Sequence, residues 1–83
     1  MGTKNFFKIE NQSPETVLLY LEPIGAEFPL KTKEEVSVFE VYKKYPITLI
    51  CSKSDKGETC ISIWSGDGEY KVEKDGVDVF ELM

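Results

Sequence analysis

The side chains that could do chemistry in this chain are two cysteines, fifteen acids and ten lysines, because its 83 residues include no histidine and no arginine. Without histidine, the most common general base near neutral pH is missing, and neither a Ser-His-Asp nor a Cys-His nucleophile can be assembled. Cys51 and Cys60 are too few for a four-cysteine zinc site. The composition therefore argues against an enzyme, and we expect no catalytic residue, cofactor or metal ion.

Two acidic turns, at residues 65–69 and 74–78, are the remaining candidates for a metal site because each places two carboxylates beside glycine. A calcium loop needs about six oxygen ligands in close register, and the EF-hand spacing is absent. Asp75-Gly76 is instead a favoured pair for a type I′ hairpin, which would set Val72 opposite Val79. Both segments are more typical of turns than of metal sites.

The overall charge limits the partners of the chain. Its formal net charge is −5, which disfavours binding to a nucleic-acid backbone. The charge permits an acidic inhibitor or antitoxin-like protein that occupies a basic site. No run reaches the ~20 apolar residues of a membrane helix, and the first residues lack the apolar stretch of a signal peptide. We expect a cytoplasmic protein with reduced thiols that binds neither nucleic acid nor membrane.

The elements that must position these side chains are short strands. Turn signals fall about every 8 to 12 residues, the spacing of a small all-β sandwich or barrel. The strands are expected at residues 6–9, 17–21, 26–30, 35–42, 47–52, 59–65, 69–74 and 77–82. Residues 17–21 are apolar on both faces and predict a central strand, whereas Pro29 predicts an edge strand. The prediction is one domain over residues 1–83, an antiparallel sandwich or partly open barrel of about seven to eight strands with little or no helix.

One segment also fits a helix. Thr32-Lys33-Glu34-Glu35 has the form of a capping box, apolar residues follow at helical spacing, and Pro46 would end the helix. The β-branched and aromatic residues over 35–42 favour a strand instead. A helical turn at Ser13-Pro14-Glu15 is a further expectation, with Ser13 as its cap.

The hairpin of residues 47–65 determines where the cysteines lie. A three-residue loop of Asp55, Lys56 and Gly57 pairs Cys51 with Ile61. The core face then holds Ile47, Leu49, Cys51, Ile61 and Ile63. A two-residue turn would pair the cysteines but mix the two faces, so the cleaner alternation is expected. It predicts that Cys51 is a buried free thiol and that no disulfide forms. Cys60 could be reactive, but no base lies near it in the sequence.

The same register places Trp64 across from Thr48, with Ile50 and Cys60 alongside, on the outer face of the sheet. Another segment could cover these residues, either the first strand or Phe80 and Leu82. Alternatively, they form an exposed apolar surface that binds a partner.

The segment Leu21-Glu22-Pro23-Ile24-Gly25 and the later Glu35-Val36, Ile61-Ser62-Ile63-Trp64 and Lys74-Asp75-Gly76 form a recognisable pattern. It resembles small uncharacterised bacterial proteins that open with a strand, a Glu-Pro-x-Gly turn and a second short strand. The resemblance implies an all-β fold and favours a strand at 35–42. It brings no catalytic residue or ligand, and Lys43-Lys44-Tyr45 departs from the pattern.

The sequence therefore predicts a noncatalytic interaction module that binds a protein partner or forms a homo-oligomer. The candidate interaction surface consists of Trp64, Ile50, Thr48 and Cys60. The alternative is a small-ligand binding domain for a carbohydrate or a similar molecule, with Tyr20, Tyr42, Tyr70 and Trp64 lining a groove or barrel mouth.

Overall fold

The computed structural model describes residues 6–40, 47–65 and 70–83, and these form eight strands and one short helix. The elements are β1 (Phe6–Glu10), β2 (Val17–Leu21), β3 (Ala26–Leu30), β4 (Glu35–Glu40), β5 (Ile47–Lys53), β6 (Thr59–Ser65), β7 (Tyr70–Lys74), β8 (Val77–Asp78) and α1 (Val79–Leu82). No helix in these residues is long and apolar enough to cross a membrane.

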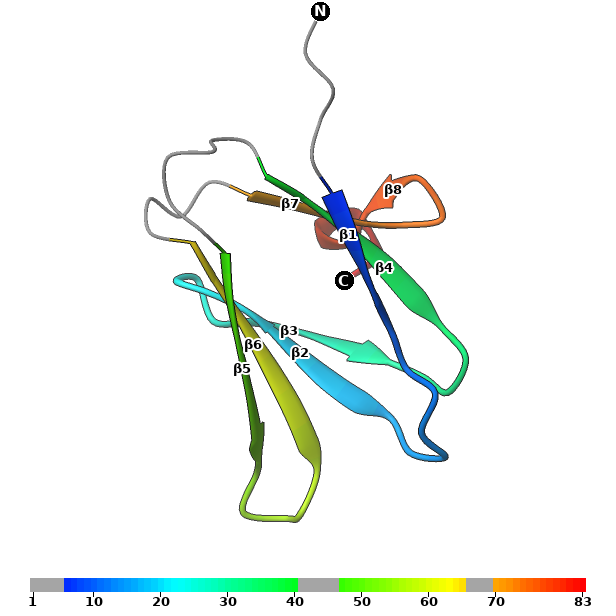
Figure 1. The fold of residues 1–83 in the computed structure, drawn as a ribbon, viewed down its shortest axis with the longest axis vertical. Helices are drawn as coiled ribbons and strands as arrows, with labels where there is room; N and C mark the ends of the chain where they lie inside the picture. Colours follow the sequence, from blue (N-terminus) through cyan, green and yellow to red (C-terminus); the bar gives the residue numbers. More distant parts are fainter. Residues whose placement is uncertain (1–5, 41–46, 66–69) are drawn as a thin grey trace, which may run out of the picture.

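The strands form two four-stranded sheets, in the orders β1-β4-β7-β8 and β3-β2-β6-β5. The sheets pack against each other, and the loop of the β5–β6 hairpin lies at the end of the molecule opposite the start of β1 (Figure 1). The all-β fold class is confirmed. The strand pairs are antiparallel except one, since β2 and β6 run parallel and pair Leu19 with Ile61. That parallel pair joins segments about forty residues apart, which local turn signals do not reveal.

The core follows from the alternation of side chains along each strand. In β2, Val17, Leu19 and Leu21 are buried while the two residues between them are half-buried. β2 lies between β3 and β6, so the prediction of a central strand is confirmed, and β3 with Pro29 is an edge strand as expected. The fully buried aliphatic side chains are Leu19, Leu21, Leu30, Val36, Val38, Ile63, Val72 and Val79.

Residues 35–40 form a strand and not the alternative helix. β4 pairs with β1 and β7, and its Val36 and Val38 are buried. A turn precedes it, in which Lys33 has a positive φ of 69° that no helix accommodates. Residues 41–46, the remainder of the proposed helix and of the predicted strand, lie outside the described residues.

The helical turn predicted at Ser13-Pro14-Glu15 is wrong. Asn11 organises this loop instead, since its Oδ1 accepts hydrogen bonds from the Ser13 backbone N–H (2.9 Å) and from the Ser13 hydroxyl (2.7 Å). The Asn11 side-chain amide donates to the carbonyl oxygens of Glu15 and Leu30. Ser13 is therefore held by Asn11 and does not cap a helix.

The predicted last strand, residues 77–82, is wrong beyond Asp78. Asp75 and Gly76 have positive φ of 53° and 80°, as the predicted type I′ turn requires. β8 then ends after two residues, because the Asp78 carboxylate accepts a hydrogen bond from the Phe80 backbone N–H (2.9 Å) and caps helix α1. The helix keeps Val79 buried against the core.

Candidate interaction surface

The β5–β6 hairpin has the register that the sequence predicts. Gly57 has φ 82°, its N–H donates to the Ser54 carbonyl oxygen (2.9 Å), and the Ser54 N–H donates to the Glu58 carbonyl oxygen (2.8 Å). Cys51 pairs with Ile61, and Ser52 pairs with Cys60. Both cysteines are free thiols, on opposite faces of the hairpin.

The four residues of the candidate interaction surface come together, but they are not equally exposed. Trp64 lies directly opposite Thr48 and is 40% exposed, and Ile50 is 49% exposed. Cys60 is only 4% exposed, because it lies on an inner strand with Leu18 and Ser52 as its direct neighbours on either side. The exposed surface therefore consists of Trp64, Ile50 and Thr48, hereafter the outer patch. Neither β1, which lies in the other sheet, nor Phe80, itself 48% exposed, hides the indole.

The predicted burial of Cys51 is wrong. Cys51 is exposed, and Leu49 on the same face is 44% exposed, although Ile63 beside it is fully buried. Both residues lie on the core-facing side of the hairpin, as predicted. They are exposed because β5 is an edge strand of its sheet. Among the described residues, no strand of the other sheet, β1-β4-β7-β8, covers that face of β5 well enough to bury them.

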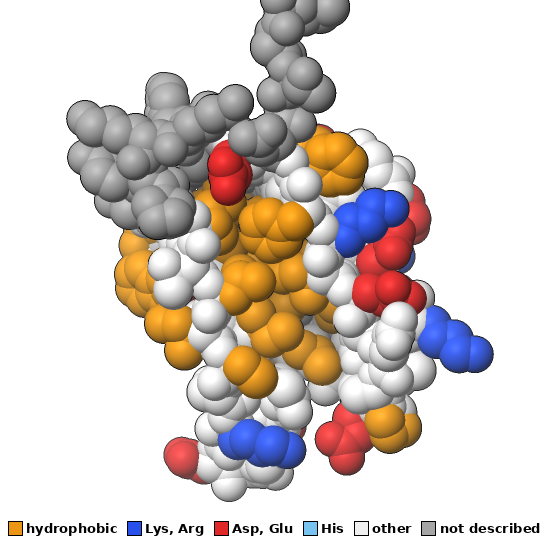
Figure 2. Space-filling model, in the orientation of Figure 1, with side chains coloured by type: hydrophobic (Ala, Val, Ile, Leu, Met, Phe, Trp, Pro, Cys, Tyr) orange, Lys and Arg blue, Asp and Glu red, His pale blue; other side chains and the backbone are white. Residues whose placement is uncertain are grey.

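The lack of cover leaves an exposed margin of the apolar core, hereafter the apolar opening. It comprises Phe7 and Ile9 of β1, Ile47 and Leu49 of β5, and Ile61 of β6, all of which are partly or substantially exposed. Figure 2 shows hydrophobic side chains gathered in the middle of this face, with charged side chains at its margins. The sequence does not reveal this opening, because the exposure of its side chains depends on how the strands of one sheet cover those of the other.

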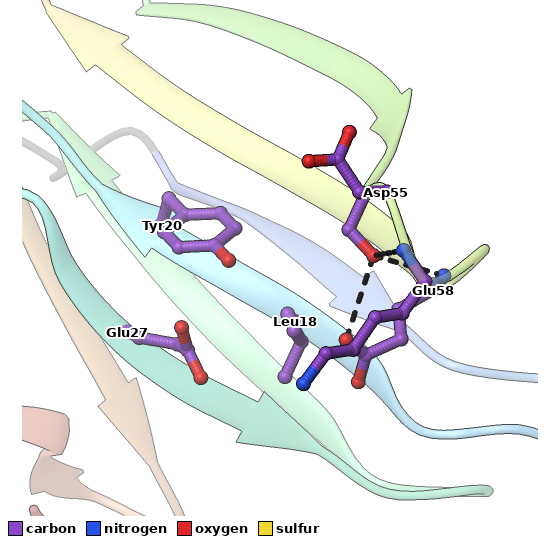
Figure 3. A pocket seen from close by; sticks show the side chains of 7 residues that line it. Leu18, Tyr20, Glu27, Asp55 and Glu58 are labelled. Carbon is purple, nitrogen blue, oxygen red and sulfur yellow. Dashed lines mark hydrogen bonds between the residues drawn. The ribbon is translucent and has the colours of Figure 1, made fainter.

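A polar groove lies on the same outer sheet face as the outer patch, between β2, β3 and the β5–β6 loop. It is a cavity of about 480 Å³ lined by Leu18, Tyr20, Glu27, Ser54, Asp55, Lys56 and Glu58. Figure 3 shows Tyr20 and Glu27 on neighbouring strands and Asp55 and Glu58 in the hairpin loop. Desolvation, and next the neighbouring Glu27 carboxylate, raise the pKa of the Tyr20 hydroxyl above its ordinary value.

A smaller cavity of about 230 Å³ lies at the β2–β3 turn, lined by Leu21, Glu22, Pro23, Ile24, Tyr70, Val72 and Phe80. Tyr70 is one of its lining residues, and its hydroxyl donates to the carbonyl oxygens of Glu22 (2.8 Å) and Ile63 (3.1 Å). Burial raises the pKa of Tyr70 to about 12. Its hydroxyl is thus engaged in holding the fold.

Three of the four aromatic residues proposed for a ligand site are described by the structure, and these three do not line a common cavity. Tyr20 lines the polar groove, Tyr70 lines the smaller cavity, and Trp64 lines neither. Tyr42 and the acidic turn at 65–69, except Ser65, lie outside the described residues. Within the described part of the chain, no three cysteine, aspartate or glutamate side chains are close enough to hold a metal ion. Comparison with protein families, with curated proteins and with solved structures found no match for this chain.

Proposed function

We propose that this chain is a noncatalytic interaction module that self-associates through the surface formed by β5 and β6 around Trp64 and Ile50. The observation that carries the proposal is the exposure of these two large apolar side chains next to each other on one hairpin. Exposed aromatic and aliphatic residues that cluster are typical of the centre of protein interfaces.

Charge supports a second copy of the same chain as the partner. Two copies each carry a formal charge of −5 and repel each other where their acids meet. The outer face of the hairpin is free of charge, since its six residues on β5 and β6 are Thr48, Ile50, Ser52, Cys60, Ser62 and Trp64. Two copies can therefore approach through this face with less repulsion than through the rest of the surface.

The proposal is tested by size-exclusion chromatography with light scattering over a series of protein concentrations. The wild-type mass should rise from 9.5 kDa toward twice that value, and Ile50→Ala should raise the midpoint concentration at least about tenfold, as expected for a large apolar side chain at the centre of an interface. Ile24→Ala is the matched control, because Ile24 is 75% exposed at the β2–β3 turn and is not part of the β5–β6 hairpin. A wild type that stays monomeric throughout, or a control that weakens association equally, would overturn the proposal.

A second candidate function, binding of a small polar ligand such as a carbohydrate, is favoured by the volume of the polar groove. Its 480 Å³ lies within the roughly 300–1,000 Å³ of small-molecule sites, and the aromatic ring of Tyr20 could stack on a sugar. Titration with maltose or cellobiose, followed by backbone amide NMR shifts, should then move signals of the groove. Loss of those shifts in Tyr20→Ala but not in Trp64→Ala would support this candidate, and an unchanged wild-type spectrum would exclude it for these sugars.

A further inference from the structure

Within the described residues, no strand pairs with the backbone groups on the outer edge of β5. The Ser54 N–H points toward β6, where it donates to Glu58, and in an antiparallel ladder the direction alternates from residue to residue. The even-numbered residues of β5 therefore bond to β6. The odd-numbered residues Ile47, Leu49, Cys51 and Lys53 direct their N–H and C=O groups to the open side, where no strand in the described residues pairs with them.

This edge differs from the other three sheet edges. β1 carries Lys8 at its centre, β3 carries Glu27 and Pro29, and β8 is only two residues long. Charges, prolines and shortness are the features by which proteins prevent strand-to-strand association. The seven residues of β5 contain no proline, and their one charge is Lys53 at the end. Of the four edges, β5 is the one that lacks these protections.

We propose that two copies of the chain pair antiparallel along β5, with Ile50 opposite Ile50 of the second copy at a two-fold axis, so that two four-stranded sheets become one eight-stranded sheet. This inference rests on the proposed self-association and specifies its geometry: the two copies meet at the β5 edge of the surface, with Ile50 at the centre of the contact and Trp64 one strand away on β6. Centring the pair on Ile50 uses every residue of β5, because Ile47 then lies opposite Lys53 of the second copy and Leu49 opposite its Cys51. The outward N–H and C=O groups of these residues meet those of the second copy and form reciprocal hydrogen bonds.

The side chains fit this register as well. Ile50 meets its own equivalent on the outer face, and Leu49 meets Cys51 of the second copy on the face of the apolar opening, so both faces of the new strand pair are apolar at the centre. The two Lys53 side chains lie at opposite ends of the pair, about 20 Å apart at the rise of a β-strand. A two-fold contact of this kind closes on itself and gives a dimer, not a fibre.

Disulfide trapping tests the geometry in a Cys51→Ser background, with Cys60 left in place because it is buried. Ile50 and its equivalent would be a non-hydrogen-bonded pair, whose Cα separation of about 4.5 Å suits a disulfide. Ile50→Cys should therefore form a covalent dimer under mild oxidation in most chains. Thr48→Cys is the matched control and should form no covalent dimer, because each Thr48 faces Ser52 of the second copy. A mixture of Thr48→Cys and Ser52→Cys should form the mixed dimer.

The results distinguish the proposed β5 pairing from self-association as such. If light scattering shows a dimer but Ile50→Cys does not crosslink, or Thr48→Cys crosslinks equally, the β5 pairing is wrong while self-association stands. A disulfide between native Cys51 residues in the wild type would show a register shifted by two residues, with Ile50 opposite Ser52, and would also overturn the pairing. A wild type that is monomeric at all concentrations refutes the self-association itself. Circular dichroism of each variant verifies that its strands are intact.

Discussion

The hydroxyl of Tyr70 lies 2.8 Å from the main-chain carbonyl oxygen of Glu22, and this hydrogen bond joins the two sheets. Tyr70 begins β7, whereas Glu22 directly follows β2. The same hydroxyl is 3.1 Å from the carbonyl oxygen of Ile63 in β6, which also accepts a hydrogen bond from the Glu22 N–H. The Tyr70 hydroxyl thus ties the end of the β2–β6 pair to β7 of the other sheet. It sets the position of the hairpin that carries Trp64.

Tyr70→Phe should lower the free energy of unfolding by about 1 to 2 kcal/mol, because it leaves carbonyl oxygens without their side-chain donor. Urea unfolding followed by circular dichroism measures the change. Lys71→Ala is the control, since Lys71 is an exposed neighbour on β7 and should change stability by less than about 0.5 kcal/mol. Equal stability of Tyr70→Phe and the wild type would show that the phenol does not join the sheets.

The same tyrosine gives the fold a specific dependence on alkaline pH. Burial raises the pKa of Tyr70 from 10.0 to about 12, so the folded state holds this proton more tightly than the unfolded state. The resulting stability is fully present below pH 10 and is lost as the pH rises from 10 toward 12. Tyr70→Phe lacks this group and should lose less stability over that interval than the wild type. Parallel slopes of unfolding free energy against pH would contradict the assignment.

Asn11 is the second polar residue on which the fold depends. It is 4% exposed, and its side chain makes four hydrogen bonds that hold the β1–β2 loop against the end of β3. Asn11→Ala should lower the free energy of unfolding by about 2 to 3 kcal/mol, since it leaves buried backbone groups without partners. Gln12→Ala is the matched control, because Gln12 is the exposed residue next to it. Similar unfolding midpoints for the two variants would refute this role.

The two cysteines should react at very different rates. Cys51 is exposed, whereas Cys60 is buried and its thiol lies 3.5 Å from the Glu58 carbonyl oxygen. A colorimetric thiol reagent added to dilute native protein should modify one thiol rapidly and the second only as the chain unfolds. Cys51→Ser should remove the rapid phase and leave the slow one. Two rapid phases would contradict the hairpin register, which places these residues on opposite faces.

These results show which features the sequence contains and which depend on tertiary structure. The hairpin register could be predicted from Gly57 and the alternation of apolar residues, because both act within a few residues of each other. Exposure could not. The sequence places Leu49 and Cys51 on the core-facing side, but their burial depends on a covering strand from the other sheet.

The local capping residues show the same limit. Ser13 and Thr32 both have the sequence signature of a helix start, yet Ser13 bonds to Asn11, and Lys33 after Thr32 takes a positive φ. Asp78 does cap a helix, although the sequence around it favours a strand by its alternation. Side chains of this kind satisfy backbone groups in several local structures, and long-range pairing determines which one forms.

The most direct test of self-association through the hairpin is sedimentation velocity of the wild type, Ile50→Asp and Ile24→Asp over the same concentration series. The two substitutions add the same charge to an exposed isoleucine, one within the outer patch and one at the β2–β3 turn. The wild type and Ile24→Asp should sediment as monomers that become dimers with rising concentration, while Ile50→Asp stays monomeric because two like charges would meet at the contact. A wild type that never dimerises, or an Ile50→Asp protein that dimerises as readily as Ile24→Asp, would contradict the proposal.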